Sequence, residues 1–162
     1  QQTFISIEYG IESCYNRTLQ RINRGHDFAT TQQAVEQTAS RGIHIGSHFI
    51  IGLPGETPGD WLNCIPLINQ MPINSIKFHQ LQIIKGTAME QEFQEHPEDF
   101  HRYSMDEYID LMVETVKCLR SDIVIERFAS EVPPKYLSTS PWKLQRYDVV
   151  LQKIREKLTI NN

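Results

Sequence analysis

Pairs of polar side chains recur within segments of this sequence that otherwise alternate between apolar and small residues. They are Glu8 with Glu12, His44 with His48, and Lys77 with His79. The members of each pair are an even number of residues apart, so both lie on one face of an extended strand. Carboxylate, imidazole and ammonium groups on one face can bind a charged ligand and exchange protons with it.

Charged groups inside a fold need partners, because burying an unpaired charge costs several kcal/mol. If these side chains line an interior, they must pair with one another, with water or with a polar ligand. The expectation is a shared hollow, lined from neighbouring parallel strands by Glu8, Glu12, His48 and Lys77.

The strands that would position these groups are predicted from alternation at residues 3–11, 43–51, 75–84 and 123–128. Helices are predicted from apolar spacing and capping signals at residues 16–23, 30–41, 57–70, 104–119 and 142–158. The helix-start signals are Thr30 with Gln33, Thr57 with Pro58, and Ser104 with Glu107. Residues 88–103 are polar and weakly patterned, and a surface loop is expected at residues 95–99.

The alternation of strands with helix-length connections favours parallel strands joined by crossover helices. A polar face on such strands suits the interior of a barrel that holds a charged ligand. An antiparallel sheet with one wet face is the alternative. The sequence thus favours an α/β fold, a partial (β/α) TIM-type barrel at residues 1–130 with a C-terminal helical extension at residues 131–162. The Gly-Leu-Pro-Gly loop at residues 52–55 lies where α/β proteins bind ligands.

The composition narrows the class of protein. The chain has 162 residues, a formal net charge of −4 and no cluster of Lys and Arg, which does not indicate strong non-specific nucleic-acid binding. No apolar run is long enough to cross a bilayer and no signal peptide is visible, so a cytoplasmic protein is expected. The cysteines Cys14, Cys64 and Cys118 are widely spaced, and we expect buried or half-buried free thiols, not a disulfide framework or a metal site.

Several motifs together resemble the radical S-adenosylmethionine (radical SAM) superfamily. They lie at residues 7–13 (Ile-Glu-Tyr-Gly-Ile-Glu-Ser), 22–26 (Ile-Asn-Arg-Gly-His) and 48–57 (His-Phe-Ile-Ile-Gly-Leu-Pro-Gly-Glu-Thr). The nearest branch includes oxygen-independent coproporphyrinogen oxidases, Elp3-like proteins and methylthiotransferases. Within it, residues 76–81, 85–87 and 125–128 resemble the YhcC-type family.

One expected feature of that superfamily is absent. The Cys-x3-Cys-x2-Cys loop that holds a [4Fe–4S] cluster does not occur in the sequence. The simplest interpretation is a C-terminal fragment that contains the later strands of the barrel. It would be inactive alone, and would tend to self-associate through its open face and strand edge. No metal ligand is assigned within the chain.

The resemblance implies an enzyme, in its full-length form, that cleaves SAM reductively to a 5′-deoxyadenosyl radical. That radical would abstract hydrogen from an unknown substrate, with flavodoxin or ferredoxin as the electron donor. Its cofactors would be SAM and a [4Fe–4S] cluster bound by residues outside the chain. An RNA-modifying radical SAM protein is one alternative. A cluster-free α/β module that binds a nucleotide or an anion at residues 52–55 is another, and the sequence upstream of Gln1 would decide between them.

The resemblance also implies roles for particular residues. Glu8, Glu12 and His48 match positions that contact the ribose or methionyl part of SAM, and Arg24 matches an arginine that binds the methionyl carboxylate. The adenine would be flanked by Ile51, Gly52, Leu53 and Pro54.

The alternatives for these residues are structural. Glu8 or Glu12 could form a salt bridge to Arg24 at the strand end, His48 could be a satisfied interior group, and residues 51–54 could simply form a turn. Lys77 and His79 are candidates for substrate contact. Glu126 and Arg127 face opposite sides, and the sequence does not show which one faces inward.

Overall fold

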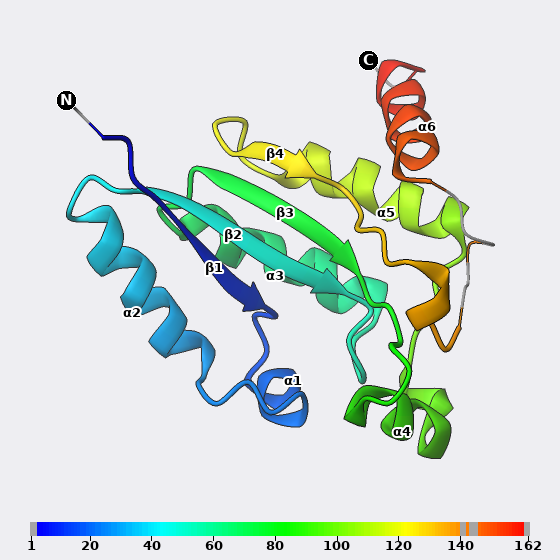
Figure 1. Cartoon of the computed structure of the whole chain (residues 1–162). Helices are drawn as coiled ribbons and strands as arrows, with labels where there is room; N and C mark the ends of the chain where they lie inside the picture. Colours follow the sequence, from blue (N-terminus) through cyan, green and yellow to red (C-terminus); the bar gives the residue numbers. More distant parts are fainter. Residues whose placement is uncertain (1–2, 140–141, 143–145, 161–162) are drawn as a thin grey trace.

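The computed structural model describes residues 3–139, 142 and 146–160. Its centre is a four-stranded sheet with the order β1-β2-β3-β4, and every neighbouring pair is parallel. The strands are β1 (Ser6–Glu12), β2 (His44–Ile51), β3 (Ser75–Gln80) and β4 (Val124–Arg127). Figure 1 shows the strands side by side in the order of the chain, and this arrangement confirms the predicted partial barrel.

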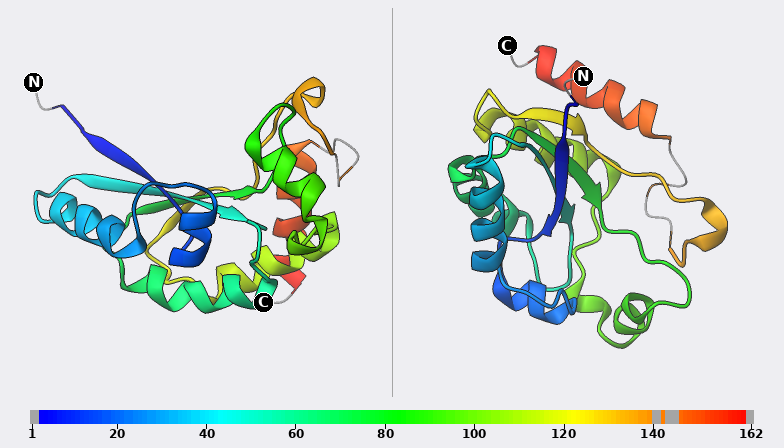
Figure 2. Two further views of the ribbon diagram at one scale, coloured as in Figure 1. Left: turned by 90° about the horizontal axis from the view of Figure 1, so that it is seen from below. Right: turned by 60° about the vertical axis from the view of Figure 1, so that its left-hand side comes forward.

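Helices cover one face of this sheet. α2 (Phe28–Ala39), α3 (Pro58–Gln70) and α5 (Met105–Cys118) each connect one strand to the next. Figure 2 shows them on the same side, while no described helix crosses the other face. The short helix α1 (Asn16–Arg21) follows β1, and α6 (Tyr147–Ile160) packs on α5. No helix among the described residues is long and apolar enough to span a membrane.

The core lies between the sheet and α3 with α5. Phe49 of β2 and Phe78 of β3 are fully buried, and each ring centroid lies 5.7 Å from that of Trp61 on α3. The Trp61 indole Nε1 donates a 2.8 Å hydrogen bond to Thr115 Oγ1 on α5. Trp61 on α3 therefore links β2 and β3 to α5. The alternate residues of those two strands point to the open face of the sheet.

Two of the three predicted helix starts are confirmed. The start of α3 is a capping box between Thr57 and Asp60, and that of α5 is one between Ser104 and Glu107. The third was wrong. α2 begins at Phe28 because the Asp27 side chain accepts a hydrogen bond from the Thr30 amide, so the cap lies three residues before the predicted one.

Other boundaries also differ from prediction. The third strand ends at Gln80, since the chain then leaves the sheet, and the polar segment after it contains a helix, α4 (Ala88–Glu95), followed by the 3-10 turn η1 (Pro97–Asp99). A further 3-10 turn, η2, spans Pro134–Tyr136. The predicted last helix included residues 143–145, which lie outside the described residues, and α6 itself begins at Tyr147.

Arg120 closes the amino-terminal end of the sheet against the end of α3. Its Nη1 donates to the carbonyl oxygens of Asn69 and Met71, and its Nη2 donates to that of Ile73, all at 2.7–2.8 Å. We expect Arg120→Ala to lower the free energy of unfolding by about 2–3 kcal/mol, because three carbonyls lose a charged donor. Urea denaturation measures this loss. Lys117→Ala, which removes an exposed helix ion pair, is the control and should cost under about 0.5 kcal/mol.

Candidate ligand site on the open face of the sheet

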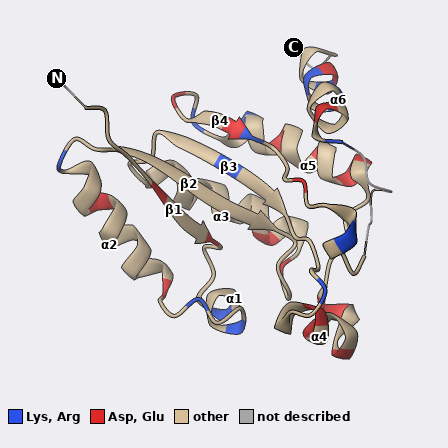
Figure 3. Cartoon of the chain, viewed as in Figure 1, with Lys and Arg blue, Asp and Glu red and all other residues tan. Residues whose placement is uncertain are grey.

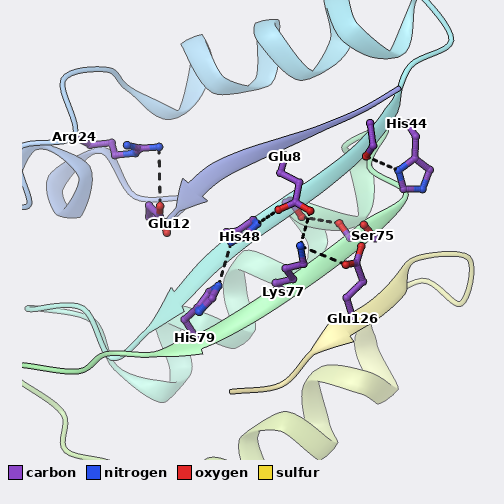
Figure 4. A network of polar contacts seen from close by, with 11 residues as sticks. Glu8, Glu12, Arg24, His44, His48, Ser75, Lys77, His79 and Glu126 are labelled. Carbon is purple, nitrogen blue, oxygen red and sulfur yellow. Dashed lines mark hydrogen bonds and ion pairs between the residues drawn. The ribbon is translucent and has the colours of Figure 1, made fainter. Parts of the chain in front are cut away.

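Glu8 is the centre of a polar network that joins all four strands of the sheet. Lys77 Nζ on β3 lies 2.5 Å from Glu8 Oε1, and His48 Nε2 on β2 lies 2.7 Å from Glu8 Oε2. Lys77 also lies 3.4 Å from Glu126 Oε2 on β4. Figure 3 shows these acidic and basic positions on neighbouring strands, and Figure 4 shows the side chains converging. Glu8, His48 and Lys77 thus converge on one face from neighbouring parallel strands, as predicted.

A glycine makes the contact between Glu8 and Lys77 possible. Gly46 of β2 pairs with Glu8 on one side and with Ser75 on the other, so it lies between β1 and β3. A Cβ atom on Gly46 would be 3.1 Å from Glu8 Cγ. The missing side chain lets Glu8 extend across β2 and reach a partner on β3.

The network sets the protonation of its members. Hydrogen bonds from Lys77 and His48 lower the pKa of Glu8 to about 2, and the same bond to Glu8 raises the pKa of Lys77. The nearby Ser75 and Lys77 side chains lower the pKa of Glu126. Both carboxylates are therefore ionised at neutral pH and act only as acceptors. Of the adjacent pair Glu126 and Arg127, Glu126 is the one that joins the network.

His79 extends the network towards the carboxyl ends of the strands. Its Nε2 lies 3.1 Å from His48 Nδ1, and the two ring planes differ by 13°. Burial lowers the pKa of His79, and the nearby His48, Arg127 and Lys77 lower it further. His79 is therefore held neutral at physiological pH. His44 lies apart, at the amino end of the sheet, where its Nδ1 is 3.2 Å from Ser6 Oγ.

Glu12 and Arg24 form a second polar pair at the carboxyl end of β1. Glu12 has a positive φ of 68° and the pairing with β2 shifts register there, so the strand ends with an irregular residue. Arg24 donates to the carbonyl of Gly10, and its Nη2 lies 4.0 Å from Glu12 Oε1. A Cβ on Gly10 would be 2.5 Å from Glu12 Oε1 and 2.8 Å from Arg24 Nη2. The bare backbone of Gly10 thus cradles both groups.

Glu12 and Arg24 do not satisfy all of each other's hydrogen-bonding groups. Burial raises the pKa of Glu12, although Arg24 and His48 favour its charged form. The Arg24 Nε is buried and has no hydrogen-bond partner among the described residues. A carboxylate and a guanidinium that meet at 4.0 Å, with an orphaned N–H beside them, fit a zwitterionic ligand that satisfies both.

The segment at residues 51–54 lies next to this face but is itself buried. Ile51 and Leu53 are each 1% exposed, and Gly52 has a φ of 90° and packs against Tyr103. The Ile51 side chain points to the helices, because it shares the parity of Phe49. Only backbone groups of this segment can reach a ligand on the open face. Ile50, which the sequence interpretation did not select, is the apolar side chain with the opposite parity.

The cysteines do not form a metal centre. Cys14 and Cys64 are buried, Cys118 is exposed, and all three are free. The prediction of free thiols is confirmed. The expected burial of Cys118 was wrong, because Cys118 is the last residue of α5 and is exposed. A hydrogen bond between the Cys14 and Cys64 thiols, together with burial, raises the pKa of Cys14. Within the described ranges, no group of three or more His, Cys, Asp and Glu residues could hold a metal ion.

The low pKa of Glu8 predicts how stability depends on pH. A carboxyl whose pKa is depressed in the folded state stabilises the fold above its unfolded value, near 4.5, and this contribution is lost as the pH falls to about 2. We expect the urea midpoint of the wild type to fall more steeply across this window than that of Glu8→Gln. Glu114→Gln, outside the network, should keep the wild-type slope. Parallel profiles for the wild type and Glu8→Gln would contradict the assignment.

This fold and its open polar face define an α/β protein of the partial-barrel type. The Radical_SAM C-terminal domain matches residues 73–159, more than half of the chain, and the chain belongs to this family. The resemblance to the radical SAM superfamily and to YhcC-type proteins, first seen in the motifs, is thereby confirmed.

The chain is similar to longer proteins. It is 28% identical over 155 residues to the uncharacterized protein MJ0486 of Methanocaldococcus jannaschii. That alignment covers 95% of this chain and 47% of MJ0486. It is 25% identical over 150 residues to YtqA of Bacillus subtilis, covering 93% and 46%. An 83-residue stretch is 40% identical to YhcC of Escherichia coli, covering 51% and 27%. The chain thus spans about half the length or less of these relatives.

A solved structure shares the fold. The archaeal Elp3 of Methanocaldococcus infernus, with an N-terminal deletion, superposes with a TM-score of 0.79 at 19% identity. The match covers 94% of this chain and 36% of that protein.

Proposed function

We propose that this chain provides the SAM-binding polar face of a radical SAM enzyme. The observation that carries the proposal is the pair of Glu12 and Arg24 over Gly10, at the carboxyl ends of the strands. Membership of the family supports it. SAM carries a carboxylate, an ammonium and a sulfonium group, and a neighbouring cation and anion match these charges.

The residues would divide the ligand between them. Arg24 would bind the methionyl carboxylate through its planar guanidinium. Glu12 would accept hydrogen bonds from the ammonium group or the ribose, and so keep its buried carboxylate charged. His48 and Glu8 would lie towards the ribose, and the backbone of residues 51–54 towards the adenine.

In this superfamily, SAM together with a [4Fe–4S] cluster and one electron supplies a 5′-deoxyadenosyl radical for hydrogen abstraction. The cysteines of this chain do not fit the cluster, so its ligands are proposed to lie outside the chain. The electron donor would be a flavodoxin or a ferredoxin. The chain's own residues bind and orient SAM and exclude water from the open face, and Lys77 and His79 would contact the substrate.

Calorimetric titration of the chain with SAM tests the binding step. We expect binding tighter than that of adenosine, and a loss of about tenfold or more in affinity for Arg24→Ala and for Glu12→Gln, because each removes a charged hydrogen bond. Arg41→Ala, which removes one bond to the Gln37 carbonyl of α2, should bind SAM like the wild type. Equal affinity for SAM and adenosine, or unchanged affinity in both variants, would refute the site.

Activity is tested on the complete protein. Reconstituted anaerobically with iron and sulfide and reduced with dithionite, it should release 5′-deoxyadenosine and methionine from SAM. The Arg24→Ala variant should release less of both, while its cluster absorbance is unchanged. A complete protein that binds a cluster but releases neither product would count against the proposed reaction.

A further inference from the structure

We infer that Glu8, His48 and His79 form a proton relay, and that Nδ1 of His79 is its ligand-facing end. The substrate of the site would then present an O–H or N–H group to His79. This inference rests on the proposed function for the presence of a substrate, but the relay itself is a property of this chain. It goes beyond SAM binding because it assigns proton transfer to side chains that the proposed function uses only for contact.

The direction of each hydrogen bond follows from the chemistry of the groups. Glu8 is ionised and can only accept, so His48 must carry its proton on Nε2, 2.7 Å from Glu8 Oε2. In a neutral His48 the other nitrogen, Nδ1, then has a free lone pair. The bond of 3.1 Å to His79 therefore requires a proton on His79 Nε2. His79 Nδ1 is left as an acceptor.

The geometry fits a relay and not a face-to-face ring stack. The ring centroids are 5.2 Å apart while the bonded nitrogens are 3.1 Å apart, and the planes differ by only 13°. The difference between these two distances is about twice the distance from the centre of an imidazole ring to one of its nitrogens. The line between the bonded nitrogens therefore runs along both rings, which meet edge to edge and nearly in one plane. This is the arrangement in which an N–H points at a nitrogen lone pair.

The relay also has a direction along the sheet. Glu8 lies opposite Gly46 in the middle of β1, whereas His79 lies opposite Ile50 near the carboxyl end of β3. Figure 4 shows the three side chains in a row, from Glu8 through His48 to His79. His79 is thus the member nearest the carboxyl end of the sheet, whereas His48, which lies opposite Gly10, is the member nearest Glu12 and Arg24.

The surroundings of His79 keep its ring neutral, so that the Nδ1 lone pair stays free. The groups that face it are His48 on β2, Arg127 on β4 and Lys77 on its own strand, and all three disfavour a positive charge on its ring. Glu8 and Glu126 lie beyond them and neutralise Lys77. A positive charge is therefore better placed on His48, beside the Glu8 carboxylate, than on His79.

The transfer can be written without a change in electron count. A ligand O–H or N–H gives its proton to His79 Nδ1, and the proton on His79 Nε2 moves to His48 Nδ1. The products are the deprotonated ligand, a neutral His79 and a His48 imidazolium paired with Glu8. The reverse sequence returns the proton.

Nitrogen-15 NMR of the imidazole rings tests the relay in this chain, without SAM. We expect a coupling between His79 Nε2 and His48 Nδ1 across the hydrogen bond. Glu8→Gln should reduce this coupling by about half or more, because a neutral amide no longer fixes the proton on His48 Nε2. Glu126→Gln is the matched control, since it removes the same charge from the other partner of Lys77, and it should leave the coupling unchanged.

Diethyl pyrocarbonate, which acylates unprotonated imidazole nitrogens, tests which end is open. Peptide mapping should show His79 modified faster than His48, whose two nitrogens are both engaged. Absence of the coupling in the wild type, equal reductions of it in Glu8→Gln and Glu126→Gln, or faster modification of His48 would each overturn the relay. SAM titration is a separate measurement, so failure of the relay and failure of the proposed function are distinguishable.

Discussion

Replacing Trp61 by alanine should lower the free energy of unfolding by about 3–5 kcal/mol, the cost of removing a large buried aromatic side chain. Trp61 is 3% exposed and lies between Phe49 and Phe78, so the cavity would open beneath β2 and β3 together. The change also leaves Thr115 Oγ1 without the indole donor. Urea denaturation with a check on the m-value measures the loss.

Two further variants divide this cost into packing and hydrogen bonding. Thr115→Val keeps the shape of the side chain but removes the acceptor of Trp61 Nε1, and it should cost about 1–3 kcal/mol for the buried unpaired N–H. Leu67→Ala lies on the same helix, where Leu67 is 37% exposed, and should cost much less. A Trp61→Ala loss no larger than that of Leu67→Ala would contradict the central position of Trp61 in the core.

Alternation along single strands was enough to predict the polar face. It placed Glu8, His48 and Lys77 on one side of the sheet, and the helix-length connections gave the parallel direction. Alternation could not predict the direct contact between Glu8 and Lys77, because that contact depends on the register between neighbouring strands. Only the pairing of Gly46 with both Glu8 and Ser75 shows that a glycine separates them.

A local irregularity of the backbone explains why alternation did not predict the position of Glu12 correctly. Parity predicted Glu12 on the face of Glu8, but the positive φ of Glu12 and the register shift after Gly10 end the strand there. Glu12 therefore pairs with Arg24 and does not contact Glu8. The strand-end salt bridge that the sequence offered as an alternative role is compatible with ligand binding, since the two groups stay 4.0 Å apart.

The missed helix α4 shows the limit of apolar periodicity. None of its residues is buried, so it leaves no apolar stripe in the sequence. Its start signal was present, because Thr87 and Glu90 have the spacing of a capping box and Thr87 does cap the helix. Arg21 then holds this region through contacts with Glu92 and Asp99, which are distant in sequence.

Replacing Gly10 by valine should strongly weaken SAM binding while the fold remains stable. The new Cβ would lie 2.5 Å from Glu12 Oε1 and 2.8 Å from Arg24 Nη2, so both side chains would have to leave their positions. They are the ends of flexible chains, and valine favours strands, so the cost to stability should stay under about 1 kcal/mol. Affinity should fall by about a hundredfold, because two charged contacts are lost together.

Calorimetry with SAM and urea denaturation on the same preparation separate these two effects. Gly59→Ala is the matched control: its Cβ would lie 3.7 Å from Thr57 Oγ1, an ordinary contact, in the first turn of α3. It should bind SAM like the wild type. If Gly10→Val keeps both its stability and its affinity for SAM, the pair of Glu12 and Arg24 does not hold the methionyl group, and the ligand must bind elsewhere on the sheet.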